Sequence, residues 1–203
     1  GLTIEEVDKL TGPVIGRLKS AIFRTVDVVG LDTLVHVANG IYENCPNDEA
    51  HELFKLPDFI TKMMANNWLG SKTNQGFYKK EGRDILSLDL ETLEYRPAKK
   101  ASFATLELTK TIDKPIDRFK VLVKGTDKAG AFYRKSFAGM FAYVSNRIPE
   151  ITNDLYKIDD AMKAGFGWEN GPFEIWDAIG VAKGIEIMKA ENLEPAAWVT
   201  EML

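Results

Sequence analysis

The stretch AGFGWENGPFEIWDAIGV, residues 164–181, carries the clearest structural signals in the chain. Its cluster of glycines resembles a loop that cradles a phosphate. A dinucleotide-binding loop, however, follows a strand and precedes a helix, so that helix N-terminal amides face the pyrophosphate. The residues before Gly165, IDDAMKA, have the pattern of a helix instead. We therefore predict that a helix stops near Gly165 and that a new helix begins with Pro172 at its first position.

The rest of the chain is mostly helical in its periodicity. Thr3 and Glu6 have the spacing of a capping box at a helix start. Apolar residues recur at helical spacing over 31–42 and again over 133–148, and a further helix is predicted over 57–67. These patterns predict a mainly α fold.

The middle of the chain has a different pattern. Short β-branched and aromatic runs between residues 76 and 97 predict a small hairpin or three-stranded patch, inserted between two helical halves. Strands and helices do not alternate as they do in a parallel sheet. We therefore expect no Rossmann domain in this chain.

Composition limits the classes of partner and compartment. The net charge of −4 disfavours nucleic acid as a partner, and no apolar run is long enough to predict a membrane span. The single cysteine, Cys45, fits a reducing compartment, and we expect a cytoplasmic protein. Because the first residue is Gly1 rather than Met, we expect the chain to be a piece of a longer protein.

The signals at 164–181 occur twice. Residues 7–31 and 158–181 both have the pattern of a helix, a glycine-containing turn and a short helix ending in Asp-x-x-Gly. The matched pairs are Asp8 with Asp159, Phe23 with Phe173, Asp27 with Asp177, and Gly30 with Gly180. Such a repeat indicates two halves related by a pseudo-two-fold axis, although chance similarity between helix–turn–helix units is the alternative. We place the two copies at residues 1–100 and 101–203.

These motifs resemble a known family. The run IDDAMKAGFGWENGPFEIWDAIGV (158–181) looks like the C-terminal, substrate-side domain of 3-hydroxyacyl-CoA dehydrogenases. Residues 10–44 resemble the same domain in multifunctional fatty-acid β-oxidation proteins, and GSKTNQGFYKK (70–80) is similar to the end of that domain's first copy. The resemblance covers roughly 1–80 and 127–192. It implies a duplicated helical domain of the type found at the C-terminus of 6-phosphogluconate dehydrogenase.

The resemblance also implies a function. The chain would be the substrate-binding and dimerisation region of an NAD-dependent L-3-hydroxyacyl-CoA dehydrogenase, which oxidises 3-hydroxyacyl-CoA to 3-ketoacyl-CoA. The family's Rossmann domain and its catalytic His–Glu pair precede this region. NAD would therefore bind the full-length enzyme rather than this chain, which alone would be inactive. The implied partners are an acyl-CoA substrate, the missing Rossmann domain and a fused enoyl-CoA hydratase domain, with no nucleic acid and no membrane span.

Few residues of the chain are candidates for catalysis. His36 has Asp32 one turn earlier to orient it, but its place beside an apolar stripe is also typical of a packed structural histidine. We expect His51 to be a solvated surface residue and Cys45 to be inert. Asn146 matches an Asn-Arg pair of the family, though in the second copy, where a helix-end hydrogen bond is the alternative. We predict no metal site.

The substrate residues are expected in the turn of the first copy, GRLKSAIF (16–23). Arg17 and Lys19 are placed to meet the charged CoA, and Phe23 to form an apolar wall of the acyl cleft. Ser20 of the same turn is a further substrate-binding candidate. Ordinary surface charge is the alternative reading of Arg17 and Lys19.

Two other functions remain open at this stage. The chain could be a non-catalytic helical interaction module, or the helical domain of a related dehydrogenase that acts on a polar substrate such as a sugar acid. A glycine-rich strand–turn–helix upstream in the full reading frame would distinguish the dehydrogenases from the module.

Overall fold

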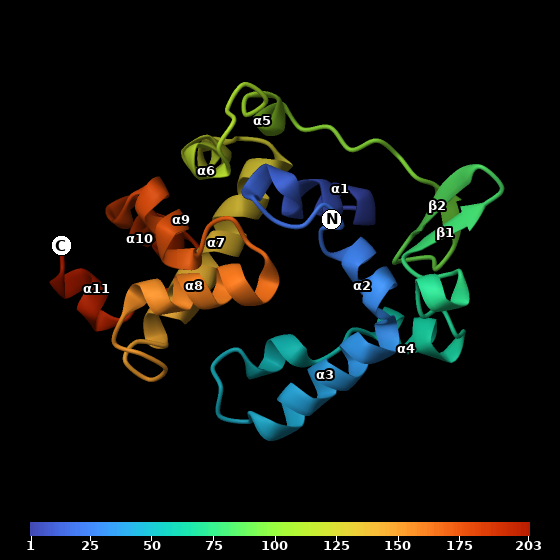
Figure 1. Ribbon diagram of the computed structural model, residues 1–203, viewed down its shortest axis with the longest axis horizontal. Helices are drawn as coiled ribbons and strands as arrows, with labels where there is room; N and C mark the ends of the chain where they lie inside the picture. Colours follow the sequence, from blue (N-terminus) through green and yellow to red (C-terminus); the bar gives the residue numbers. More distant parts are fainter. The chain divides into compact units, whose positions relative to one another are not determined.

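The computed structural model describes residues 1–203 and is mostly helical, with one small antiparallel sheet (Figure 1). The predicted mainly α fold is confirmed. The chain forms two compact units: unit 1 comprises Gly1–Thr11 and Ser20–Ala101, and unit 2 comprises Gly12–Lys19 and Ser102–Leu203. The short segment Gly12–Lys19, which we assigned to the first copy, thus packs with unit 2.

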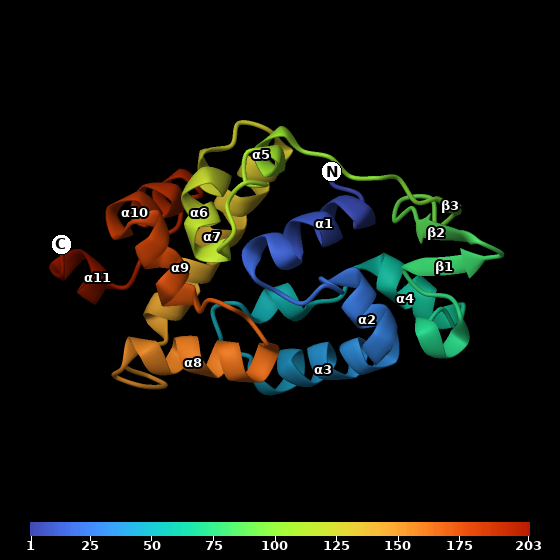
Figure 2. The ribbon, with the colours of Figure 1, turned by 45° about the horizontal axis from the view of Figure 1, so that its top comes forward.

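Unit 1 combines four α-helices with the sheet. Its elements are α1 (Ile4–Thr11), α2 (Phe23–Val29), α3 (Leu31–Asn44), η2 (His51–Phe54), α4 (Asp58–Ala65), η3 (Ser71–Thr73), β1 (Tyr78–Glu81), β2 (Asp84–Leu88) and β3 (Tyr95–Pro97). The strands lie side by side in the order β1-β2-β3, both pairs antiparallel (Figure 2). The predicted three-stranded patch is therefore present.

The core of unit 1 joins the helices to the sheet. It contains Ile4, Leu31, Ile60, Met63, Phe77 and Leu88, all at most 4% exposed. The predicted capping box starts the first of these helices: the backbone N–H of Thr3 donates to the Glu6 carboxylate (2.8 Å), and that of Glu6 to Thr3 Oγ1 (3.3 Å). The box satisfies two N–H groups that would otherwise lack partners at the helix start.

A buried carboxylate ties α1 to the sheet. Glu5 accepts hydrogen bonds from Arg96 (2.8 Å), from the Ser87 hydroxyl (2.8 Å) and from the backbone N–H of Lys99 (2.8 Å). Burial alone would raise the pKa of the Glu5 carboxyl, but these hydrogen bonds outweigh it and lower the pKa to about 2. The ionised form is therefore favoured in the folded state.

We expect Glu5→Gln to destabilise the chain in a pH-dependent way. A carboxyl with a lowered folded-state pKa stabilises the fold above its unfolded-state pKa and loses that effect as the pH falls towards its folded-state pKa. The expected loss is roughly 2–3 kcal/mol at pH 7, and it should shrink progressively below pH ~4.5. Urea unfolding at pH 7, 4 and 3 measures it, with exposed Glu43→Gln as the matched control. A Glu5→Gln loss that is independent of pH would contradict this assignment.

Unit 2 is helical throughout. Its elements are η1 (Pro13–Ile15), α5 (Ala104–Glu107), α6 (Pro115–Lys124), α7 (Lys128–Asn146), α8 (Leu155–Phe166), α9 (Pro172–Ile179), α10 (Val181–Ala190) and α11 (Ala197–Glu201). Helices α6, α9 and α10 all pack on α7, the longest helix of the chain (Figures 1 and 2). No helix combines the length and apolar character needed to cross a lipid bilayer.

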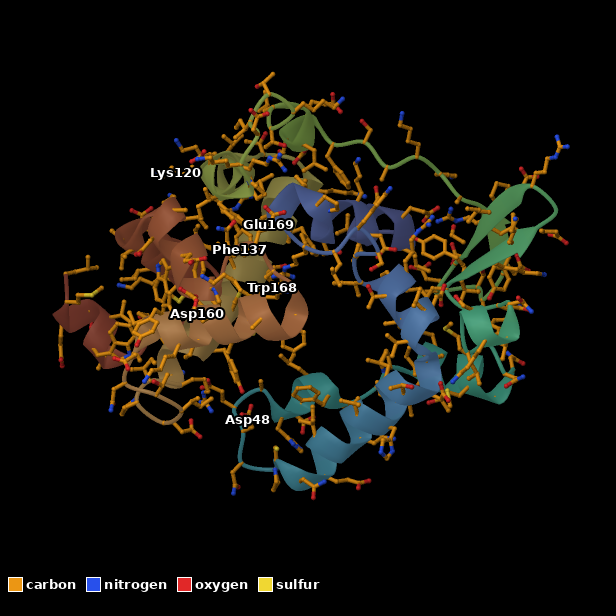
Figure 3. All side chains as sticks on the ribbon, in the orientation of Figure 1. Asp48, Lys120, Phe137, Asp160, Trp168 and Glu169 are labelled. Atoms are coloured by element: carbon orange, nitrogen blue, oxygen red, sulfur yellow. The ribbon has the colours of Figure 1, made fainter.

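Stacked aromatic rings form the core of unit 2. Tyr133, Phe137 and Phe141 follow one another at every fourth residue of α7, with ring centroids 5.7 and 5.9 Å apart. Trp176 of α9 continues the stack, 4.8 Å from Phe141. Figure 3 labels Phe137 within this helix. The i, i+4 spacing brings the rings onto one helix face, which α9 covers.

The position of the helix stop differs from our prediction. Helix α8 continues through Gly165 to Phe166, and Gly167 ends it with a left-handed backbone (φ 65°). Glycine adopts this conformation without strain, so the second glycine of the pair serves as the cap. The predicted start is confirmed, because Pro172 is the first residue of α9.

Candidate functional site

The two glycine turns have the same geometry. Gly16 lies eight residues after Asp8 and Gly167 eight residues after Asp159, and both are left-handed, with φ of 66° and 65°. Within unit 2 the turns pack together: the carbonyl oxygen of Gly16 accepts a hydrogen bond (2.8 Å) from the backbone N–H of Glu169. The predicted repeat is therefore reproduced in the local backbone.

Arg17, predicted to meet CoA, lies at this contact between the turns. Its guanidinium carbon is 3.7 Å from the centre of the Trp168 ring, and Figure 3 shows Trp168 and Glu169 next to each other in the turn. Burial lowers the pKa of Arg17 to about 10, so the group remains charged at neutral pH. Its contact with Trp168 is a cation–π interaction.

The other three predicted substrate residues have different surroundings. Lys19 is exposed in unit 2, while Ser20 and Phe23 belong to unit 1. The Ser20 hydroxyl is 2.7 Å from that of Thr25. The half-buried Phe23 ring lies 4.6 Å from the Phe77 ring, centre to centre. Lys19 is thus the predicted residue whose side chain is most free to meet a ligand.

Equivalent aspartates cap the helices that follow the two turns. Asp8 Oδ1 accepts the backbone N–H of Phe23 at 2.7 Å, at the start of α2. Asp159 Oδ1 accepts that of Phe173 at 2.8 Å, near the start of α9. Burial raises the pKa of both carboxyls, and the hydrogen bonds from backbone amides oppose the rise. The two caps perform the same structural task in each copy.

The second pair of aspartates differs sharply between the copies. Asp27 is buried and accepts the backbone N–H groups of Phe77 and Tyr78, each at 2.8 Å. Burial raises the pKa of Asp27, again opposed by these hydrogen bonds. Asp177, at the equivalent place on α9, is exposed and accepts no hydrogen bond. Each helix then ends at a glycine with nearly the same backbone, φ 109° at Gly30 and 103° at Gly180.

Each unit also contains a pocket that the sequence did not predict. The pocket of unit 1 has a volume of about 390 Å³ and lies between α3, η2 and α4; it is lined by Val35, Asn39, Tyr42, Phe54, Lys55, Leu56, Ile60, Thr61 and Met64. The pocket of unit 2 has a volume of about 300 Å³; it is lined by Leu155, Tyr156, Asp159, Phe173, Glu174, Trp176, Asp177, Val181, Trp198, Val199 and Met202. The lining residues of each pocket come from several elements, so no local sequence pattern marks the pocket.

The two histidines have different surroundings, and His51 has a carboxylate near its ring: its Nε2 lies 3.8 Å from the exposed carboxylate of Glu52. His36 is exposed rather than packed, and Asp32 pairs with Lys72 instead of with it. His51 is not a solvated surface residue: it is half-buried, and its ring stacks on Tyr42 with centroids 4.1 Å apart. Both corrections have one cause: Lys72, which pairs with Asp32, and Tyr42, which stacks on His51, belong to other elements than the residues they contact, and periodicity within one element cannot reveal them.

The remaining candidates lie at helix ends. Asn146 is the last residue of α7, in unit 2, and is half-buried. Cys45 follows the last residue of α3 and is an exposed free thiol. No group of three or more His, Cys, Asp or Glu side chains is placed to hold a metal ion.

Comparison with known proteins finds one family and several relatives that the chain resembles. Residues 1–80 match the family described as "3-hydroxyacyl-CoA dehydrogenase, C-terminal domain". The whole chain is 44% identical to a Bacillus subtilis protein named "Probable 3-hydroxyacyl-CoA dehydrogenase", of which it covers 26%. A Deinococcus radiodurans protein of the same name is 50% identical over 80 residues, which are 39% of this chain and 22% of that protein.

A more distant relative has a name that describes a trifunctional enzyme. A Rickettsia prowazekii protein named "Putative fatty acid oxidation complex trifunctional enzyme" is 25% identical over 179 residues, 86% of this chain and 23% of that protein. The chain thus spans about a quarter of the length of the relatives that it matches.

Proposed function

We propose that the chain is the substrate-binding and dimerisation region of an NAD-dependent L-3-hydroxyacyl-CoA dehydrogenase, because residues 1–80 match the family of that enzyme's C-terminal domain. The observation that carries the proposal is the 44% identity to the Bacillus subtilis relative along all 203 residues. The two copies of the domain would occupy residues 1–100 and 101–203, with Gly12–Lys19 of the first copy packed in unit 2.

The proposed reaction divides its tasks between this chain and a dinucleotide-binding domain. Oxidation of the 3-hydroxyl group transfers a hydride to NAD, and a base removes the hydroxyl proton. In this chain Asp32 pairs with Lys72 rather than with His36, and the Glu52 carboxylate beside His51 is exposed and 3.8 Å from Nε2, beyond hydrogen-bond distance. The chain would therefore bind and orient acyl-CoA, and alone it would be inactive. The cytoplasm, the predicted compartment, agrees with the exposed free thiol of Cys45.

The proposed substrate contacts are those predicted from the sequence, now with distinct tasks. Lys19 is exposed and would meet a CoA phosphate. Ser20, whose hydroxyl lies 2.7 Å from that of Thr25, is a further proposed contact. Arg17 would act through its positive charge, since its guanidinium is stacked on Trp168. Phe23 is half-buried and would offer its free part to the acyl chain. A fused enoyl-CoA hydratase domain is a proposed further partner, in keeping with the name of the Rickettsia relative.

A chimeric enzyme tests the proposal. The segment of the Bacillus subtilis relative that aligns with this chain is replaced by residues 1–203, and NADH formation from 3-hydroxybutyryl-CoA is followed. We expect activity within about tenfold of the unmodified relative, because substrate orientation would be retained. Lys19→Glu in the chimera should raise KM severalfold, with exposed Lys124→Glu as its control. A folded chimera without activity would favour a non-catalytic interaction module.

A further inference from the structure

A short segment of unit 1 is held by three residues of the repeat. Asp27 accepts the backbone N–H groups of Phe77 and Tyr78, and Asp8 accepts the Tyr78 hydroxyl at 2.8 Å. The Phe77 ring, 1% exposed, lies against Phe23. The segment Gly-Phe-Tyr (76–78) thus donates hydrogen bonds to the carboxylates of Asp27 and Asp8 and buries the ring of Phe77.

The equivalent three residues of unit 2 line an open pocket. Asp159, Phe173 and Asp177 correspond to Asp8, Phe23 and Asp27, and all three border the pocket of about 300 Å³. No Gly-Phe-Tyr sequence follows α10 in the chain. Trp198 of α11 forms one wall, 6.3 Å from the Phe173 ring, but its indole N–H donates to the Ser145 carbonyl (3.0 Å). The Asp177 carboxylate is left exposed.

The chemistry of this pocket suits a peptide. Its lining combines four aromatic rings with three carboxylates, of which Asp159 already caps α9 and Glu174 pairs with Lys163 at 2.7 Å, so that Asp177 is the carboxylate left to accept hydrogen bonds. Such a lining attracts N–H donors and apolar rings and repels anions such as phosphates. Acyl-CoA, which carries phosphates, is therefore a poor occupant.

We propose that the unit 2 pocket docks an extended segment of a partner protein with the sequence pattern Gly-aromatic-aromatic. The first aromatic ring would enter the pocket beside Phe173, which is 6% exposed and borders it, and two consecutive backbone N–H groups would donate to Asp177. Glycine is required before the rings because the carboxylate approaches the backbone closely. In unit 1, a Cβ on residue 76 would lie 2.1 Å from Asp27 Oδ1. This inference does not depend on the dehydrogenase activity.

The chain itself supplies the probe. A fluorescent peptide with the sequence of residues 70–80, GSKTNQGFYKK, is titrated with the 203-residue chain, and anisotropy is measured. The control peptide GSKTNQAFYKK has the same charge and the same rings and differs by one Cβ. The variant Asp177→Asn removes the accepting charge, and Glu191→Gln, exposed just after α10, is its matched control.

The expected result is saturable binding of the glycine peptide, weakened at least tenfold by Asp177→Asn and unchanged in Glu191→Gln, since hydrogen bonds to a charged group are strong. The alanine peptide should also bind at least tenfold more weakly. Because Asp177 is exposed, the variant should melt at the wild-type temperature. Absence of saturable binding, equal binding of the two peptides, or an unchanged affinity in Asp177→Asn would each overturn the proposal.

Discussion

Phe173→Ala is expected to lower the free energy of unfolding of unit 2 by about 3–5 kcal/mol. The side chain is 6% exposed, and its ring lies 6.4 Å from Trp176 and 6.3 Å from Trp198. Removing it leaves a cavity beside two large rings that are held by other contacts, so the site cannot collapse fully. Urea unfolding followed by tryptophan fluorescence measures the loss. Three of the four tryptophans, Trp168, Trp176 and Trp198, belong to unit 2.

The equivalent change in unit 1 serves as the comparison. Phe23 is only half-buried, although its ring packs on Phe77. Phe23→Ala should therefore cost less than Phe173→Ala, because less apolar surface returns to water. In the chimera described above it should also raise KM for acyl-CoA. Equal losses of stability from both changes, with an unaltered KM, would show that Phe23 is a core residue and no part of a substrate site.

Asp27→Ala is expected to cost about 2–6 kcal/mol, since it leaves the N–H groups of Phe77 and Tyr78 without their acceptor and each buried unsatisfied group costs about 1–3 kcal/mol. These N–H groups hold β1 and the Phe77 ring in place. Loss of the carboxylate should therefore weaken the whole core of unit 1. Urea unfolding followed by circular dichroism gives the size of the effect.

The repeat provides the matched control for Asp27. Asp177 occupies the equivalent place on α9 but is exposed and accepts no hydrogen bond. Asp177→Ala should change the free energy of unfolding by no more than about 0.5 kcal/mol. Hydrogen exchange at the amides of Phe77 and Tyr78 should accelerate only in Asp27→Ala. A comparable loss from both substitutions would mean that the carboxylates stabilise their helices rather than a docked segment.

Local patterns in the sequence predicted most of the fold. The capping box at Thr3, the helix predicted over 31–42 and the first residue of α9 each depend on neighbours within a few positions. The repeat paired Asp8 with Asp159, and the structure gives these two side chains equivalent positions as helix caps, a role that the sequence did not predict. The prediction was wrong where two nearby residues were equally good candidates for the end of a helix. Gly165 and Gly167 both suit a helix end, and only the residue that takes a positive φ is the cap.

The candidate site was harder to predict, because its contacts join distant parts of the chain. Nothing near Arg17 in the sequence indicates that its guanidinium stacks on Trp168. The stack of His51 on Tyr42 likewise brings together two elements, η2 and α3. For Asp27, the motif at 70–80 was recognised by resemblance, but periodicity gives no sign that its amides bind that carboxylate.

The segment Gly12–Lys19 has a consequence for the order of events during synthesis. Its partners lie far downstream: Arg118 donates to the carbonyls of Pro13 and Val14, and Glu169 to that of Gly16. A ribosome that adds roughly 5–20 residues per second needs about 8–30 s to make the last of these partners after the segment. Ile15, 4% exposed in the finished fold, therefore stays exposed at least until α6, which packs on η1, has been made. The segment Gly12–Lys19 thus reaches its full set of native contacts only after most of unit 2 has been made.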